Sequence, residues 1–150
     1  MEPRHPDWKA RCLDSFGRQA VMGSFGVSVA DLAPGAVTLE MAFDATLTQQ
    51  HGFLHAGVVT TVLDSACGYA AFTLMPATAE VLTIEFKSNF LAPARGERFR
   101  FAGEVVRPGR TITVTQGKAY AIDAGREVLI STMQATMMVV EGRPDLAQGG

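Results

Sequence analysis

The feature that most constrains this chain is an apolar stretch from Gly57 to Leu74, in which Asp64 is the only charged side chain. Its length favours a buried helix over a strand, because an almost uninterrupted apolar run of this length exceeds a typical strand. Pro76 follows and is expected to stop the helix. A helix that is apolar over most of its circumference must be surrounded by other parts of the chain.

The second half of the chain supplies that surrounding layer as strands separated by Pro- and Gly-containing turns. The expected strands are residues Glu80–Leu91, Arg98–Arg107, Thr111–Ile122 and Glu127–Val140. Their short connections suit antiparallel neighbours and leave no room for the helices of a doubly wound parallel fold. The order predicts an α+β fold in which one curved antiparallel sheet surrounds one central helix.

The first half adds a hairpin and a short helix. Phe25–Leu32 and Ala36–Phe43 have strand-like composition and are joined at Ala33-Pro34-Gly35, which is turn chemistry. Apolar residues recur near helical spacing from Asp7 to about Met22, with Asp7 as the expected N-cap.

Length, composition and charge restrict the class of protein. A chain of 150 residues with 47% apolar and 19% charged side chains predicts a single folded domain, residues 1–150, with its core at about 24–141. A net charge of −2 argues against nucleic acid as the main partner. The absence of a bilayer-length apolar run or a signal-peptide core predicts a cytoplasmic protein without a membrane partner. Cys12 and Cys67 are expected to be reduced.

Asp64 interrupts the apolar pattern of the central helix. Positions 57, 60, 61, 64, 68 and 71 share one helix face and carry Gly, Thr, Thr, Asp, Gly and Ala. These small residues leave space for a ligand or another backbone, whereas a solvated face more often carries long charged side chains. Asp64 is therefore a candidate general base or nucleophile in a cleft. The alternative is a carboxylate on an exposed stripe or bonded to a local backbone group.

The segment Gln49–Gly57 brings amide and imidazole side chains to the start of this helix, where free N–H groups and the helix dipole favour an oxyanion. His51 and His55 have the spacing of a metal pair, but a glycine lies between them and no glutamate does, so no metal is expected. Ser65 lacks the Gly-x-Ser-x-Gly pattern, and Cys67 has no basic neighbour. Neither is expected to be the nucleophile.

The segment His55–Ala66, HAGVVTTVLDSA, resembles the HGG(x)nDxA signature of hot-dog-fold acyl-CoA thioesterases. It resembles in particular the phenylacetic-acid-degradation (PaaI-like) type within the 4-hydroxybenzoyl-CoA thioesterase superfamily. The resemblance covers roughly Gly35–Val140 and continues through TIEFK at 83–87, FLAPA at 90–94 and RPGRT at 107–111. It implies the hot-dog fold, with a curved antiparallel sheet wrapped around one long helix.

The resemblance also implies catalytic roles. Asp64 matches the catalytic carboxylate, and the amide of Ala56 or Gly57 matches the group that polarises the thioester carbonyl. His55 matches the motif histidine, and Gln49 matches the Asn or Gln that orients water or substrate. Thr83 matches the hydroxyl beside the carboxylate. Two residues depart from the usual pattern, because Ala56 replaces the first Gly and Gln49 replaces an Asn.

A basic segment provides the expected contacts with the substrate. Between Lys87 and Lys118 there are seven cationic side chains and two acidic ones. For Arg98 and Arg100, the alternative is an ordinary solvated outer face of the sheet. The resemblance assigns coenzyme A binding to the turn that holds Arg107, Gly109, Arg110 and Thr111. Arginine is suited to the phosphates of coenzyme A because its guanidinium forms paired hydrogen bonds. Phe90 is a candidate acyl-binding residue, together with Phe53 and Phe72; core packing is the alternative for all three.

The interval between Gly57 and Asp64 bears on assembly. Seven helical residues separate the backbones by ~10 Å along the axis, too far for both residues to contact one carbonyl carbon. The spacing predicts that the amide comes from one subunit and Asp64 with Thr83 from its neighbour. The family resemblance likewise implies a homodimer or a dimer of dimers, that is, a homotetramer.

Taken together, these features predict an acyl-CoA thioesterase without metal or redox cofactor, in which Asp64 acts as general base or nucleophile and a helix-terminal amide forms the oxyanion hole. One alternative is a hot-dog hydratase or dehydratase that uses His55 with Asp64. Another is a non-catalytic protein that binds acyl-CoA.

Overall fold

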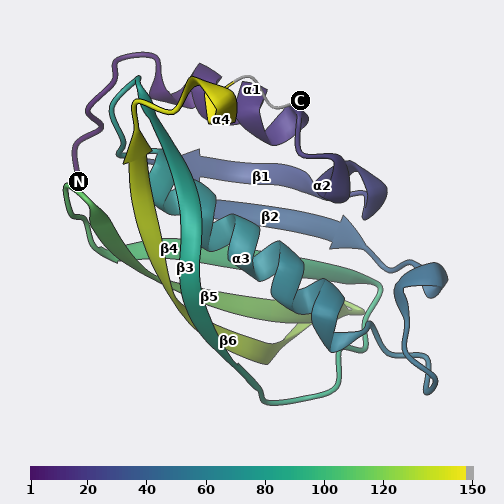
Figure 1. The fold of residues 1–150 in the computed structure, drawn as a ribbon. Coiled ribbons are helices and arrows are strands. Elements are labelled where there is room, and N and C mark those ends of the chain that lie inside the picture. Colours follow the sequence, from purple (N-terminus) through teal and green to yellow (C-terminus); the bar gives the residue numbers. More distant parts are fainter. Residues whose placement is uncertain (148–150) are drawn as a thin grey trace.

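A computed structural model describes residues 1–147. Within that range the chain forms one six-stranded antiparallel sheet in the order β1-β2-β4-β5-β6-β3, curved around helix α3 (Figure 1). The strands are β1 Ser28–Ala33, β2 Ala36–Ala42, β3 Ala79–Phe90, β4 Arg98–Arg107, β5 Ile112–Asp123 and β6 Arg126–Glu141. The helices are α1 Trp8–Gly17, α2 Ala20–Ser24, the 3-10 turn η1 Ala45–Leu47, α3 Ala56–Phe72 and α4 Pro144–Ala147. This is the predicted hot-dog fold.

Helix α3 is the centre of the hydrophobic core. Its Val, Leu, Ala and Cys side chains pack against the inward residues of the sheet, such as Leu39, Phe99 and Phe101, each of which is fully buried. Alternate residues along β4 and β5 are buried because successive side chains of a strand point to opposite faces. The stretch from Gly57 to Leu74 is therefore apolar because the sheet surrounds this helix, as the sequence predicts.

Two glycines allow α3 to lie close to the sheet. Gly103 of β4 and Gly117 of β5 are paired across the ladder. A Cβ atom on Gly103 would lie 2.3 Å from the carbonyl oxygen of Ala66 in α3. On Gly117 it would lie 2.8 Å from Cδ1 of Leu63. The helix therefore packs directly against the part of the sheet where these two glycines lack side chains.

The predicted hairpin and central helix are confirmed, and a short N-terminal helix with Asp7 as its N-cap residue is present, but this helix ends earlier than expected. The N-terminal helix is divided into α1 and α2, with Arg18 and Gln19 between them. Asp7 precedes α1, but its side chain makes no capping hydrogen bond. The last four strands are also not all sequential neighbours, because β3 pairs with β6 rather than with β4.

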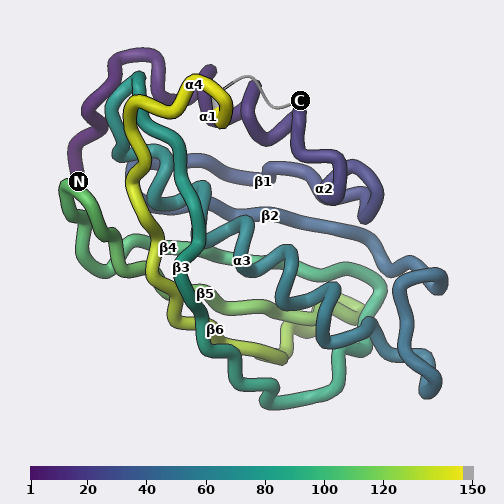
Figure 2. Tube along the Cα trace, viewed as in Figure 1, coloured from purple at the N-terminus to yellow at the C-terminus, as the bar shows by residue number. Residues whose placement is uncertain are grey.

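The connection from β3 to β4 explains that strand order. Residues 91–97 cross the end of the sheet near the start of α3, as the tube in Figure 2 shows. The backbone N–H of Leu54 donates to the carbonyl of Ala94, and the N–H of Phe43 donates to the carbonyl of Glu97. This crossing leaves β3 at the edge of the sheet and places its last residues beside the start of α3.

No helix in residues 1–147 is both long and apolar enough to cross a membrane.

Candidate active site

Asp64 lies in the middle of α3, where it meets the edge strand β3. The hydroxyl of Thr83 donates a hydrogen bond of 2.9 Å to Asp64 Oδ1. Thr83 is opposite the buried Met137 on β6, and a β-bulge follows between Thr83 and Glu85. Because Thr83 shares the concave face with Met137, its hydroxyl can reach the helix. The prediction that these two residues lie together agrees with this geometry.

The surroundings of Asp64 favour its protonated form. Burial raises the pKa of the Asp64 carboxyl above its ordinary value, and the hydrogen bond from Thr83 partly opposes that rise. Desolvation penalises the charged form, whereas a donor stabilises the carboxylate. Oδ2 has no protein donor among residues 1–147. Asp64 therefore has one positioned oxygen and one oxygen available to a water molecule or a substrate.

The N-terminal helices also reach this site. A cavity of about 160 Å³ is bordered by Asp64, Thr83, Glu80 and Gln19. Gln19 Oε1 accepts a hydrogen bond of 3.1 Å from the hydroxyl of Ser65, which leaves the Gln19 amide N–H groups without a protein acceptor in the described part of the chain. Sequence reasoning missed Gln19, because it lies far from Asp64 along the chain and belongs to no motif.

Two backbone amides at the start of α3, those of Ala56 and Gly57, differ in their hydrogen bonding. His55 is the N-cap residue, and its Nδ1 accepts a hydrogen bond of 2.8 Å from the N–H of Gly57. The N–H groups of Val58 and Val59 donate to the carbonyl of His55. Within the described residues, the N–H of Ala56 has no acceptor. Of the two predicted amides, Ala56 is thus the free donor and Gly57 is occupied by the cap.

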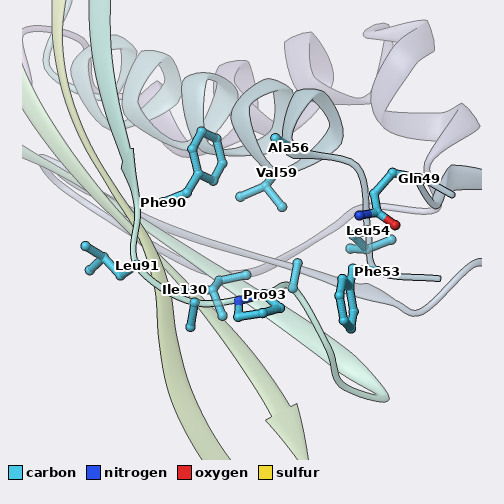
Figure 3. A pocket seen from close by; sticks show the side chains of 11 residues that line it. Gln49, Phe53, Leu54, Ala56, Val59, Phe90, Leu91, Pro93 and Ile130 are labelled. Atoms are coloured by element: carbon cyan, nitrogen blue, oxygen red, sulfur yellow. The ribbon is translucent and has the colours of Figure 1, made fainter. Parts of the chain in front are cut away.

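A cavity of about 420 Å³ opens beside this amide (Figure 3). Ala56 and Val59 line it from α3. Figure 3 shows Gln49 and Phe53 on one side and Phe90 with Leu91 on the other. Most of these side chains are apolar, so the cavity suits an apolar group next to an oxyanion site. Of the predicted aromatic residues, Phe53 and Phe90 line this cavity, whereas Phe72 is buried in the core.

Gln49 is held in the loop before α3. Its Oε1 accepts a hydrogen bond from the backbone N–H of His51. The side chain of Gln49 also lines the cavity. His51 is exposed at the loop surface, and residues 1–147 contain no group of three His, Cys, Asp or Glu side chains placed to hold a metal ion.

The predicted coenzyme A turn lies at the opposite end of α3. Gly35 N–H donates to Thr73 just beyond the end of the helix, and Gly35 accepts from Val105 near the end of β4. Arg107, Gly109, Arg110 and Thr111 form the turn that follows, next to the N-terminus (Figure 1). A Cβ atom on Gly109 would lie 1.9 Å from the carbonyl oxygen of Ile112, so this tight turn requires glycine. Both arginines are exposed.

One chain therefore holds the predicted site in separate parts. Ala56, Gln49 and Phe90 line the cavity at the start of α3, whereas Asp64 and Thr83 line a different cavity. Ala56 and Asp64 belong to one uninterrupted helix, which keeps them on the order of 10 Å apart along its axis. The structure brings Asp64 to Thr83 but does not bring either residue to Ala56 within the chain.

Two other nucleophile candidates are unsuited to the role. Burial raises the pKa of the Cys67 thiol to about 12, so it stays protonated near neutral pH. Ser65 is buried, and its hydroxyl donates to Gln19 rather than to a histidine. Asp64 is the better candidate for the chemistry.

Comparison with known proteins gives a consistent result. In structure, the chain is similar to a thioesterase family protein from Silicibacter pomeroyi, with 58% identity and a TM-score of 0.89 over 90% of this chain and 99% of that one. It has the same fold as the Escherichia coli PaaI protein of the phenylacetic acid degradation operon, with 15% identity and a TM-score of 0.77 over 86% and 90% of the two chains.

Sequence comparison adds a relative and a family. A predicted esterase of Saccharolobus solfataricus is 34% identical over 90 residues, which are 60% of this chain and 64% of that protein. This chain thus spans less than two thirds of that relative. The model of the thioesterase superfamily matches residues 51–128, just over half of the chain and the part that holds α3. The protein belongs to the thioesterase superfamily.

Proposed function

We propose that this protein hydrolyses acyl-CoA thioesters to a carboxylic acid and free coenzyme A. The observation that carries this proposal is the pair formed by Asp64 and Thr83, in which a carboxyl group of raised pKa has one oxygen positioned and one free. The Ala56 N–H at the start of α3, which has no acceptor among residues 1–147, lies beside an apolar cavity and is a hydrogen-bond donor for an oxyanion. Membership of the thioesterase superfamily supports the same reaction.

In the proposed reaction, Asp64 Oδ2 accepts a proton from water as the water oxygen attacks the thioester carbonyl carbon. The Ala56 N–H donates to the oxyanion that forms, aided by the positive end of the helix dipole. The C–S bond then breaks, and the proton on Asp64 passes to the departing sulfur of coenzyme A. Gln49 faces the same cavity and is proposed to orient the acyl carbonyl or the water.

Direct attack by Asp64 is the covalent alternative, in which an anhydride forms and water then cleaves it. A single turnover in ¹⁸O-labelled water identifies the covalent route if the label enters Asp64. General-base attack places the label in the product acid, whereas cleavage of an anhydride at its enzyme carbonyl places it in Asp64.

A complete site requires a second copy of the chain. Strand β3 is an unpaired edge of 12 residues, and Ile84 and Phe86 are 50% and 43% exposed. Such an edge is a template for another strand. We propose that two β3 strands pair across a two-fold axis, which also brings the stripe of Thr60, Thr61 and Asp64 against its symmetry mate. Ala56 of one subunit then meets Asp64 of the other.

The same arrangement accounts for coenzyme A binding. The turn with Arg107 and Arg110 lies at the end of α3 away from Ala56 of its own chain. In an antiparallel helix pair, that end is near the partner's Ala56. We propose that these arginines bind coenzyme A phosphates of a thioester held at the partner's amide.

Release of free thiol from a panel of acyl-CoA esters tests this function. Short, medium, long and aryl acyl groups are incubated with the protein, and coenzyme A is measured with a thiol reagent. Thioester hydrolysis is expected to release thiol and acid in equal amounts. A hydratase or dehydratase would change the acyl group without releasing thiol, and a binding protein would do neither.

Mixing two inactive variants tests the shared site. Ala56→Pro removes the N–H but suits the first helical position, and His55 already has φ −61° and ψ 139°, which a following proline favours. Asp64→Asn removes the base. Each homodimer is expected to be nearly inactive, whereas subunit exchange restores about a quarter of wild-type activity through hybrid sites. No recovery after proven exchange would contradict a shared site.

A further inference from the structure

A second cavity, of about 390 Å³, adjoins the cavity at the start of α3. The two cavities share Phe53, Ala92 and Pro93 in their walls. The second cavity reaches the end of the β5–β6 hairpin, where the paired residues Ala121 and Val128 line it. The two cavities therefore lie side by side, with Phe53 in the wall of both.

The walls of the two cavities differ in charge. Among residues 1–147, only uncharged side chains line the first cavity, whereas Arg95, Arg126 and Asp123 line the second. None of these three groups takes part in an ion pair within residues 1–147. The guanidinium of Arg95 lies 5.3 Å from the centre of the Phe53 ring, so it is held at the junction between the cavities. Two cations and one carboxylate give the wall of the second cavity a net positive charge.

We propose that the second cavity is a subsite for an anionic group, such as a carboxylate, at the far end of the acyl chain. This inference rests on the proposed thioesterase function. In the proposed complex, the thioester carbonyl binds at Ala56. The coenzyme A part of the substrate then extends toward the partner's Asp64 and the partner's basic turn, and the acyl group enters the apolar cavity. The part of the substrate that passes Phe53 is then the acyl terminus, and Arg126 and Arg95 offer it paired hydrogen bonds.

Matched substrates test this subsite. Glutaryl-CoA and pentanoyl-CoA have acyl chains of equal length, and only the first ends in a carboxylate. The wild-type protein is expected to have a higher kcat/KM for glutaryl-CoA. In Arg126→Gln and in the double variant with Arg95→Gln, the ratio of the two kcat/KM values is expected to fall about tenfold, the usual effect of losing a charged hydrogen bond.

Arg98→Gln is the control, because Arg98 faces the outside of the sheet near Glu40. It removes the same charge and should leave the ratio unchanged. The proposal is overturned if the wild type does not favour glutaryl-CoA, or if the arginine variants weaken both substrates equally, which would assign these arginines to the phosphates of coenzyme A.

Calorimetric binding of both esters to Asp64→Asn repeats the comparison without turnover. A preference for glutaryl-CoA in this measurement supports the subsite even if no acyl-CoA is hydrolysed, so failure of the subsite and failure of the thioesterase function are distinguishable. Equal dissociation constants for the two esters would overturn the subsite on their own.

Discussion

Replacing Asp64 by asparagine is expected to lower kcat for acyl-CoA hydrolysis about a thousandfold, because a positioned general base contributes factors of this size. Asparagine has the same shape, and its carbonyl oxygen can still accept the hydrogen bond from Thr83. It cannot accept a proton from water. KM is expected to change little, since the proposed coenzyme A contacts are elsewhere. Thiol release under saturating substrate measures the effect.

The control for this variant is Asp31→Asn, which removes an exposed carboxylate on β1 and should retain wild-type kcat. Stability should not explain the loss. A carboxyl group whose folded-state pKa is raised stabilises the fold only at low pH, and that contribution is lost as pH rises through the folded pKa. Asp64→Asn is therefore expected to unfold at or above the wild-type temperature at pH 7. Wild-type kcat in Asp64→Asn would refute the assigned base.

The pH profile provides a second readout for Asp64. Because the base acts unprotonated, kcat should fall toward acid, and the raised pKa of Asp64 places this fall above the range of an ordinary aspartate. Thr83→Val removes the donor that lowers this pKa and should move the acid limb to higher pH. If the acid limb of the kcat profile does not move in Thr83→Val, the titration of another group controls that limb.

Replacing Gly103 by alanine is expected to lower the free energy of unfolding by about 3 kcal/mol or more, as overpacking against a rigid element does. The added Cβ would lie 2.3 Å from the carbonyl oxygen and 2.4 Å from the carbonyl carbon of Ala66. Both atoms belong to the α3 backbone, which cannot move aside without losing its packing on the sheet. Urea denaturation at a fixed protein concentration measures the change.

Alanine substitutions at two further glycines serve as comparisons for Gly103→Ala. Gly117→Ala should cost less, because its contacts are the flexible ends of Leu63 and Cys67 rather than backbone. Gly17→Ala, at the end of α1, meets nothing within 4 Å and should be neutral or slightly stabilising. If Gly103→Ala unfolded at the same urea concentration as wild type, the close contact between α3 and β4 would be wrong.

Much of the fold was predictable from local patterns. The apolar stretch around Asp64 specifies a buried helix, and alternation with turn residues specifies the strands, because these signals depend on neighbouring residues alone. The split between α1 and α2 was not predicted, because apolar spacing alone does not locate a helix break. The Asp64–Thr83 pair followed from a family motif rather than from the chemistry of the two residues.

The sequence by itself determined one central helix, its single carboxylate and the chemistry available at its start. Only the tertiary structure decided that β3 lies at the sheet edge and that Gly103 lies under Ala66. It also decided that the His55 imidazole accepts from the N–H of Gly57, which leaves the Ala56 N–H without an acceptor in the described part of the chain. The physical reason is the distance along the chain over which each kind of interaction acts. Helix and strand preferences act over a few neighbouring residues, whereas strand pairing, close packing and the use of each N–H depend on groups that only the folded chain brings together.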